Sequence, residues 1–142
     1  MTGENDFVDL MLRPGMIAEV KRLAAREVKV SCVFLSLRQM RETIALLENN
    51  GLECGYLAYN PEQNRHTPRE ELDNFVASVK QAKQLAASHG APLVVGPGMK
   101  FISSREEDYV LAAPHADVWL IQSQRFQIDS STGRRATPDE YR

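Results

Sequence analysis

Short apolar runs alternate with helically spaced apolar residues along most of this chain. Residues 28–35 are rich in β-branched and apolar side chains, and apolar residues then recur at intervals of three and four up to the Asn49-Asn50-Gly51 stop. The same alternation repeats three more times. It predicts strands at 28–35, 52–59, 93–96 and 117–124, and helices at 14–26, 37–48, 67–90 and 103–113.

Strands that are connected through helices must run parallel, so the pattern predicts an α/β fold with about four βα units. Two architectures fit. One is half of a (β/α)8 barrel, which needs about 250 residues in all. The other is a small flavodoxin-like open sheet, which usually carries a fifth strand and a phosphate loop. No GxGxxG or GxxxxGK[ST] motif occurs, which favours the half barrel.

A helix-start signature occurs twice. Thr67-Pro68-Arg69-Glu70 places a hydroxyl at the N-cap, proline at the first helical position and a carboxylate three residues later, ahead of a long amphipathic stretch. Thr137-Pro138-Asp139-Glu140 repeats it just before Arg142. We therefore expect a single α/β domain over residues 1–142, incomplete at its C-terminus, with residues 1–12 poorly ordered.

Composition narrows the class of partner. The chain has 142 residues, 43% of them hydrophobic and 25% charged, which suits one globular domain with a core. The formal charge is −2 with both signs mixed, so we expect no nucleic-acid or membrane partner. No apolar run approaches the ~20 residues of a spanning helix, and residues 1–7 do not resemble a signal peptide. We expect a soluble, cytoplasmic protein.

The cysteines and histidines indicate neither a metal site nor a cofactor. The two cysteines, Cys32 and Cys54, fall in strand-like segments, and we expect buried, reduced thiols, although neighbouring parallel strands could bring them together. There is no CxxC motif, and His66, His89 and His115 are scattered.

Ligands of parallel α/β folds bind beyond the carboxyl ends of the strands, so those ends carry the candidate residues. The second predicted strand delivers Tyr59 and Asn60 as candidate substrate-binding residues. Glu62 is the candidate general acid or base, and His66 is the candidate imidazole. Each of the last two could equally be a solvated loop residue or a partner of the helix cap.

The third and fourth predicted strands are followed by residues of different chemical character. Gly96, Gly98, Lys100 and a cap at Ser103 could hold an anion, or the segment is a tight turn stiffened by proline. At the fourth strand, alternation directs Trp119 and Ile121 to the helices and Gln122 and Gln124 to the barrel mouth. We interpret these two amides, with Arg125, as substrate-binding residues or as a satisfied amide network.

Four segments together resemble poorly characterised bacterial TIM-barrel proteins that look like glycoside hydrolases: Tyr59-Asn60-Pro61-Glu62, His66-Thr67-Pro68 with Glu70-Glu71, Leu93-Val94-Val95-Gly96-Pro97 and residues 117–124. The resemblance implies a barrel that binds or hydrolyses a carbohydrate, and it assigns no catalytic residue. Two other classes stay open. One is a self-associating, non-enzymatic module that forms a homodimer through its inner sheet face. The other is a phosphate-ligand enzyme.

Overall fold

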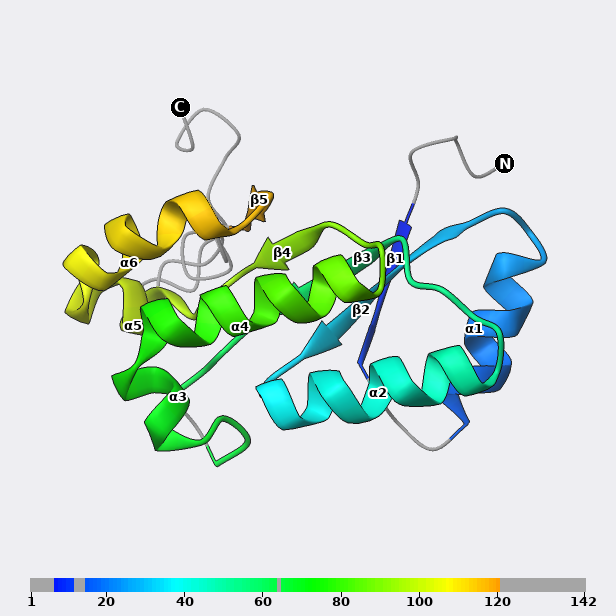
Figure 1. Ribbon diagram of the computed structural model, residues 1–142, viewed down its shortest axis with the longest axis horizontal. Coiled ribbons are helices and arrows are strands. Elements are labelled where there is room, and N and C mark those ends of the chain that lie inside the picture. The colour runs from blue at the N-terminus through cyan, green and yellow to red at the C-terminus, as the bar shows by residue number, and fades with distance from the viewer. Residues whose placement is uncertain (1–6, 12–14, 64, 121–142) are drawn as a thin grey trace, which may run out of the picture.

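The computed structural model describes residues 7–11, 15–63 and 65–120, and Figure 1 shows their arrangement. Strands and helices alternate throughout. In chain order they are β1 (Phe7–Met11), α1 (Met16–Ala24), β2 (Lys29–Phe34), α2 (Leu37–Asn49), β3 (Tyr56–Tyr59), α3 (Arg69–Asp73), α4 (Phe75–Ser88), β4 (Leu93–Val95), α5 (Met99–Ser104), α6 (Glu106–Ala112), the 3₁₀ turn η1 (Ala113–His115) and β5 (Val118–Trp119).

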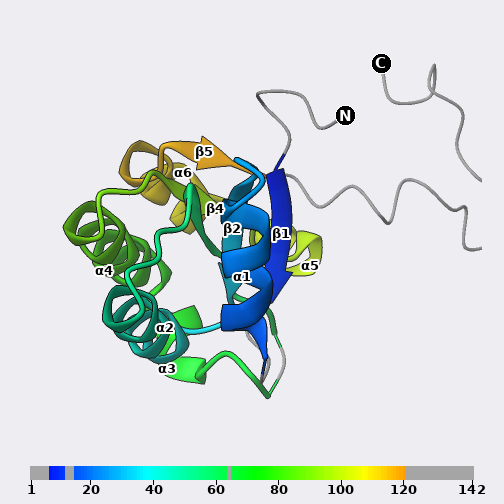
Figure 2. The same ribbon diagram turned by 90° about the vertical axis from the view of Figure 1, so that its right-hand side faces the viewer.

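All five strands are parallel and lie in the order β1-β2-β3-β4-β5. The α/β class and the parallel sheet are therefore confirmed. A sequential order is that of consecutive units in a barrel wall, whereas a flavodoxin-like sheet has the order 2-1-3-4-5. Figure 2 shows α1, α2 and α4 on the same side of the sheet. The two faces of the sheet therefore have different surroundings.

One face packs against the helices and holds the core. The strand register places Cys32, Leu57 and Leu93 in one cross-strand row, and each of them is fully or almost fully buried. The next row toward the carboxyl ends contains the larger side chains Phe34, Tyr59, Val95 and Trp119. These rows pack against buried side chains of the four long helices, which are Met16, Val20, Leu23, Met40, Leu47, Phe75, Val79, Ala82 and Ala112.

Aromatic contacts fix the last strand against this core. The Trp119 indole N–H donates to the Ala113 carbonyl oxygen at 2.9 Å, and its ring centroid lies 4.7 Å from that of Tyr109. Phe75 contacts Phe101 edge-on at 4.8 Å between centroids. The prediction that Trp119 faces the helices is confirmed, while Ile121 lies outside the described residues.

The structure corrects three sequence predictions. A strand forms at Phe7–Met11, where no regular element was predicted, and the rest of residues 1–12 lies outside the described residues. The helix predicted over 67–90 breaks at Asn74 into α3 and α4. Thr67 does not cap it: α3 begins at Arg69 without a side-chain cap, and the Thr67 hydroxyl donates instead to the Leu35 carbonyl at 2.6 Å. For Thr67, a hydrogen bond to a residue distant in the sequence replaces the predicted local helix cap.

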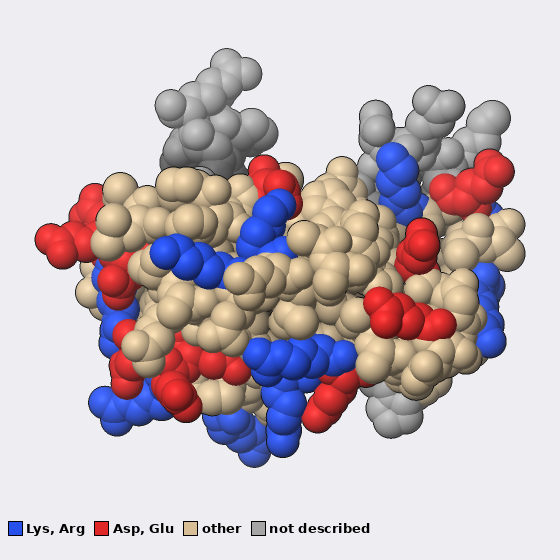
Figure 3. Space-filling model, in the orientation of Figure 1, with Lys and Arg blue, Asp and Glu red and all other residues tan. Residues whose placement is uncertain are grey.

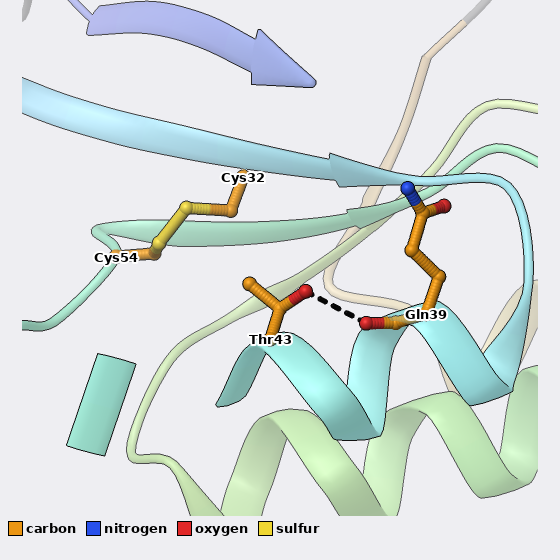
Figure 4. Close-up of a disulfide and its surroundings, with 4 residues drawn as sticks. All are labelled: Cys32, Gln39, Thr43 and Cys54. Atoms are coloured by element: carbon orange, nitrogen blue, oxygen red, sulfur yellow. Dashed lines mark hydrogen bonds between the residues drawn. A yellow bond between two sulfur atoms is a disulfide. The ribbon is translucent and has the colours of Figure 1, made fainter. Parts of the chain in front are cut away.

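The two cysteines form a disulfide, so the expectation of reduced thiols is wrong for this structure. Cys32 of β2 and Cys54, just ahead of β3, have Cα atoms 6.0 Å apart. Figure 4 shows the bridge beside the strands, facing α2, in which the Thr43 hydroxyl donates to the Gln39 carbonyl at 2.7 Å. Both cysteines are buried, so the bridge is part of the helix-side core.

The surface carries charges of both signs. Lys and Arg side chains lie next to Asp and Glu side chains on the face shown in Figure 3, so neither sign dominates that face. Among the described residues, no helix combines the length and the apolar character needed to cross a membrane.

Candidate functional site

The second sheet face has regular rows of its own, and they define the candidate site. Val33, Ala58, Val94 and Val118 lie opposite one another in one cross-strand row. Two backbone hydrogen bonds extend the ladder past the strands, from Gly96 to Tyr59 at 3.1 Å and from Leu120 to Val95 at 2.9 Å. A further row, nearer the carboxyl ends, therefore contains Asn60, Gly96 and Leu120.

Asn60 is the least ordinary residue of this row. Among the described residues, none donates a hydrogen bond to its side-chain oxygen Oδ1, which is buried. The backbone on either side is fixed, because the Asn60 N–H donates to the Phe34 carbonyl at 2.8 Å and the next residue, Pro61, is fully buried. Buried amide oxygens nearly always have a donor, so an orphaned one on a rigid backbone indicates a position where a donor from outside is accepted.

Gly96 makes room for that amide. A Cβ atom at position 96 would lie 2.9 Å from Asn60 Oδ1 and 3.3 Å from Leu120 Cβ. Only glycine at position 96 lets the Asn60 side chain lie across the end of β4 in this way. The glycine was predicted to bring backbone close to an anion, but its neighbour in the structure is the neutral amide of Asn60.

A hollow of about 170 Å³ lies along this face. Its walls are mainly aliphatic, with polar groups at the two ends. The lining residues are Ser31, Val33, Tyr56, Ala58, Asn60, Val94, Val118 and Leu120. Asn60 is therefore placed as predicted, at a concave surface where the strands end.

Tyr59 is on the opposite face, which corrects its assignment to ligand binding. Its ring is fully buried in the helix-side core, and its hydroxyl donates to Glu71 Oε2 at 2.9 Å. Burial, the negative charge of Glu71 and this hydrogen bond together raise the pKa of the Tyr59 phenol far above its ordinary value of 10.0. The Glu71 carboxylate also accepts the N–H of Leu37, at 3.0 and 3.2 Å, and so stabilises the start of α2. Tyr59 is a structural residue.

Glu62 and His66 lie in the loop after β3. The Glu62 N–H donates to the Thr67 hydroxyl at 3.0 Å, and since that hydroxyl also binds Leu35, the loop is tied to the end of β2. His66 is exposed, and its Nε2 lies 3.4 Å from Arg65 Nε. Neither residue is among those lining the described hollow. Their catalytic roles stay predictions.

The residues predicted to hold an anion are arranged differently from the prediction. Gly98 precedes α5, and its carbonyl accepts the N–H groups of Phe101 and Ile102. Ser103 lies inside α5, so the predicted cap at Ser103 is wrong: α6 begins at Glu106, after Arg105 and without a side-chain cap. The first turn of α6 holds three acidic residues, which disfavour a bound anion there. The Lys100 side chain lies outside the described residues.

Gln122, Gln124 and Arg125, which follow β5 in the chain, also lie outside the described residues. The predicted amide pair therefore stays a prediction. The alternation that leads to it is confirmed as far as Leu120, which lines the hollow together with Val118.

Sequence reasoning missed the walls of the site. Ser31, Val33 and Ala58 were assigned to strands without regard to face. Alternation along β2 separates Ser31 and Val33 from Val30, Cys32 and Phe34, and alternation along β3 separates Ala58 from Leu57 and Tyr59. No group of three or more His, Cys, Asp or Glu residues that could hold a metal occurs within residues 7–11, 15–63 and 65–120. A search of family descriptions, of curated proteins and of solved structures found no match to this chain.

Proposed function

We propose that this protein binds a small hydroxyl-bearing ligand of the carbohydrate class at the carboxyl ends of its strands. The observation that carries the proposal is the buried Asn60 Oδ1, to which no described residue donates a hydrogen bond. A hydroxyl group is the simplest neutral donor that would satisfy it. The sequential parallel sheet supports the proposal, because in barrel walls this end is where ligands bind.

Stability offers a way to separate a ligand-binding asparagine from a structural one. Removing a side chain that satisfies a buried partner destabilises the protein, whereas removing an orphaned acceptor also removes a desolvation cost. Asn60→Ala should therefore leave the protein as stable as the wild type or more so. Sites kept for function commonly show this trade between stability and activity.

Binding is tested by isothermal titration with a panel of neutral monosaccharides and their methyl and phenyl glycosides. Loss of one hydrogen bond of ~1–1.5 kcal/mol predicts about a tenfold weaker Kd for Asn60→Ala. Asn49→Ala is the matched control, because Asn49 is exposed at the end of α2. If the panel fails to bind the wild type, or if both variants bind alike, Asn60 is not a carbohydrate ligand.

Hydrolysis is the further step of this proposal, with Glu62 as the carboxylate. A two-carboxylate mechanism also needs a partner roughly 5–10 Å away. Glu71 is engaged by Tyr59 and Leu37 on the helix side. We therefore propose binding first, and turnover only if Glu62→Gln abolishes release of 4-nitrophenol from nitrophenyl glycosides while sugar binding persists.

Self-association is the second candidate, and exposed side chains on the same face favour it. Val118 and Leu120 are 43% and 45% exposed on the last described strand. We propose a homodimer that covers them, tested by light scattering on a sizing column. A mass of one chain across the accessible concentration range would exclude it.

The cytoplasmic location also stays a proposal, and the Cys32–Cys54 bridge weighs against it, because disulfides persist mainly in oxidising compartments. Alkylation of fresh cell extract without reductant decides the question: two modified cysteines would indicate a reducing compartment, and none an oxidising one.

A further inference from the structure

The inner-face hollow has a chemical polarity that restricts the ligand more than the proposed function does. Its middle row consists of the aliphatic side chains Val33, Ala58, Val94 and Val118. Polar groups stand only at the ends, with Ser31 and Tyr56 in the row before it and Asn60 in the row after it. Rows on the same face lie two residues, or about 7 Å, apart.

A ligand with hydroxyl groups on every side does not suit this lining. A hydroxyl facing the aliphatic row would lose its hydrogen bonds to water and gain none. An apolar ring of the ligand loses nothing there and buries its surface. The hollow, at about 170 Å³, is similar in size to an apolar cavity of about 150 Å³ that holds benzene.

The lining also restricts the charge of the ligand. The eight described residues that line the hollow include no Asp, Glu, Lys, Arg or His, and the register places Asp9 of β1 opposite Ser31, in the row farthest from Asn60. A carboxylate or phosphate beside the aliphatic row or Asn60 would be desolvated without a counter-charge, which is costly. The part of the ligand that lies there should therefore be neutral.

We infer that the ligand is a neutral alcohol or glycoside with a compact apolar ring, which occupies the hollow while its hydroxyl donates to Asn60 Oδ1. The inference rests on the proposed function and specifies which part of the ligand enters the site. By this reasoning, unsubstituted sugars bind weakly, whereas alcohols and glycosides that carry a separate apolar ring bind well.

Amide NMR titration with three probes distinguishes the proposed function from the further inference that the ligand carries an apolar ring. Benzyl alcohol carries a ring and a hydroxyl, toluene carries only the ring, and glucose carries only hydroxyls. We expect benzyl alcohol to bind several-fold more tightly than toluene, and glucose to bind weakest. Glucose binding more tightly than benzyl alcohol would overturn the inference and leave the proposed function standing. Failure of all three probes would overturn both.

Variants test the two contacts separately. Asn60→Leu keeps the branched shape of the side chain and removes the acceptor, so it should weaken binding of benzyl alcohol five- to tenfold and affect binding of toluene much less. Gly96→Ala displaces the Asn60 amide without deleting it and should have the same effect if Asn60→Leu does not fold. Ala58→Leu fills the middle row and should weaken benzyl alcohol and toluene together.

Val110→Ala is the control, because Val110 is 62% exposed on α6 and does not line the hollow. Equal binding of benzyl alcohol to the wild type and to both Asn60→Leu and Gly96→Ala would overturn the role given to the amide oxygen. Unchanged binding to a folded Ala58→Leu would show that the ring lies elsewhere.

Discussion

Replacing Glu71 with alanine removes one acceptor from two donors that lie in different parts of the fold. The carboxylate binds the Tyr59 hydroxyl at 2.9 Å and the Leu37 N–H at 3.0 and 3.2 Å. The first donor is in the core below β3, and the second is in the first turn of α2. Glu71 therefore joins α3 to both, and its loss leaves two donors without this acceptor.

The magnitude follows from these two groups. Losing the acceptor at the helix start costs ~1 kcal/mol. Removing the acceptor of a buried tyrosine hydroxyl costs about 1–3 kcal/mol. We expect Glu71→Ala to lower the free energy of unfolding by roughly 3 kcal/mol in total. Glu70→Ala is the control, because Glu70 is the exposed neighbour on the same helix, and it should stay within about 0.5 kcal/mol of wild type.

Urea unfolding measures both values, followed by the fluorescence of the chain's single tryptophan, Trp119, which packs against Tyr109 in the native state. A double-mutant cycle adds a sharper criterion. Tyr59→Phe deletes the hydroxyl, so it should offset part of the loss in the Glu71→Ala background, by about 1–2 kcal/mol. If Glu71→Ala loses no more stability than Glu70→Ala, or if the two substitutions are simply additive, the carboxylate does not hold these donors.

Three other results are expected. Because the pKa of Tyr59 is raised in the folded protein, stability present below pH 10 should fall as the pH rises further, and less so in Tyr59→Phe; parallel alkaline melting curves would contradict this. The pKa of Asp117 is lowered by hydrogen bonds from Lys83 and from the Leu93 N–H, so stability should fall as the pH drops below about 4, and Asp117→Asn should flatten that limb of a pH-dependent melting series. The disulfide closes a loop with a sequence separation of 22, so Cys54→Ala should cost about 3 kcal/mol in urea unfolding, and an unchanged midpoint would refute a stabilising bridge.

The order of elements could be predicted from the sequence, because the apolar residues that each element buries on one face recur at a regular spacing along the chain. β1 was missed because Phe7-Val8-Asp9-Leu10-Met11 places an acid in the middle of an apolar run, so no clear period shows there. The break at Asn74 was missed for the opposite reason. The apolar spacing continues across it, so periodicity alone predicts one helix.

The site was predictable only in part. Alternation alone would have separated Tyr59 from Asn60, since neighbours in a strand point to opposite faces. The contact between Asn60 and Gly96 needs the register of β3 against β4, which no local pattern encodes. The same holds for the disulfide, which depends on how β2 lies against the segment before β3, and for Thr67, which binds a carbonyl 32 residues away in the chain.

The sequential strand order also has a kinetic consequence. Each strand pairs with the strand that follows it in the chain, one or two helices later, and no described pairing skips a unit. The entropic cost of closing loops then arises in small increments. A low mean sequence separation between contacting residues also favours rapid folding. The chain can grow along one edge unit by unit, as repeat proteins do. Hydrogen exchange should accordingly show protection rising in blocks that correspond to single strand-helix units.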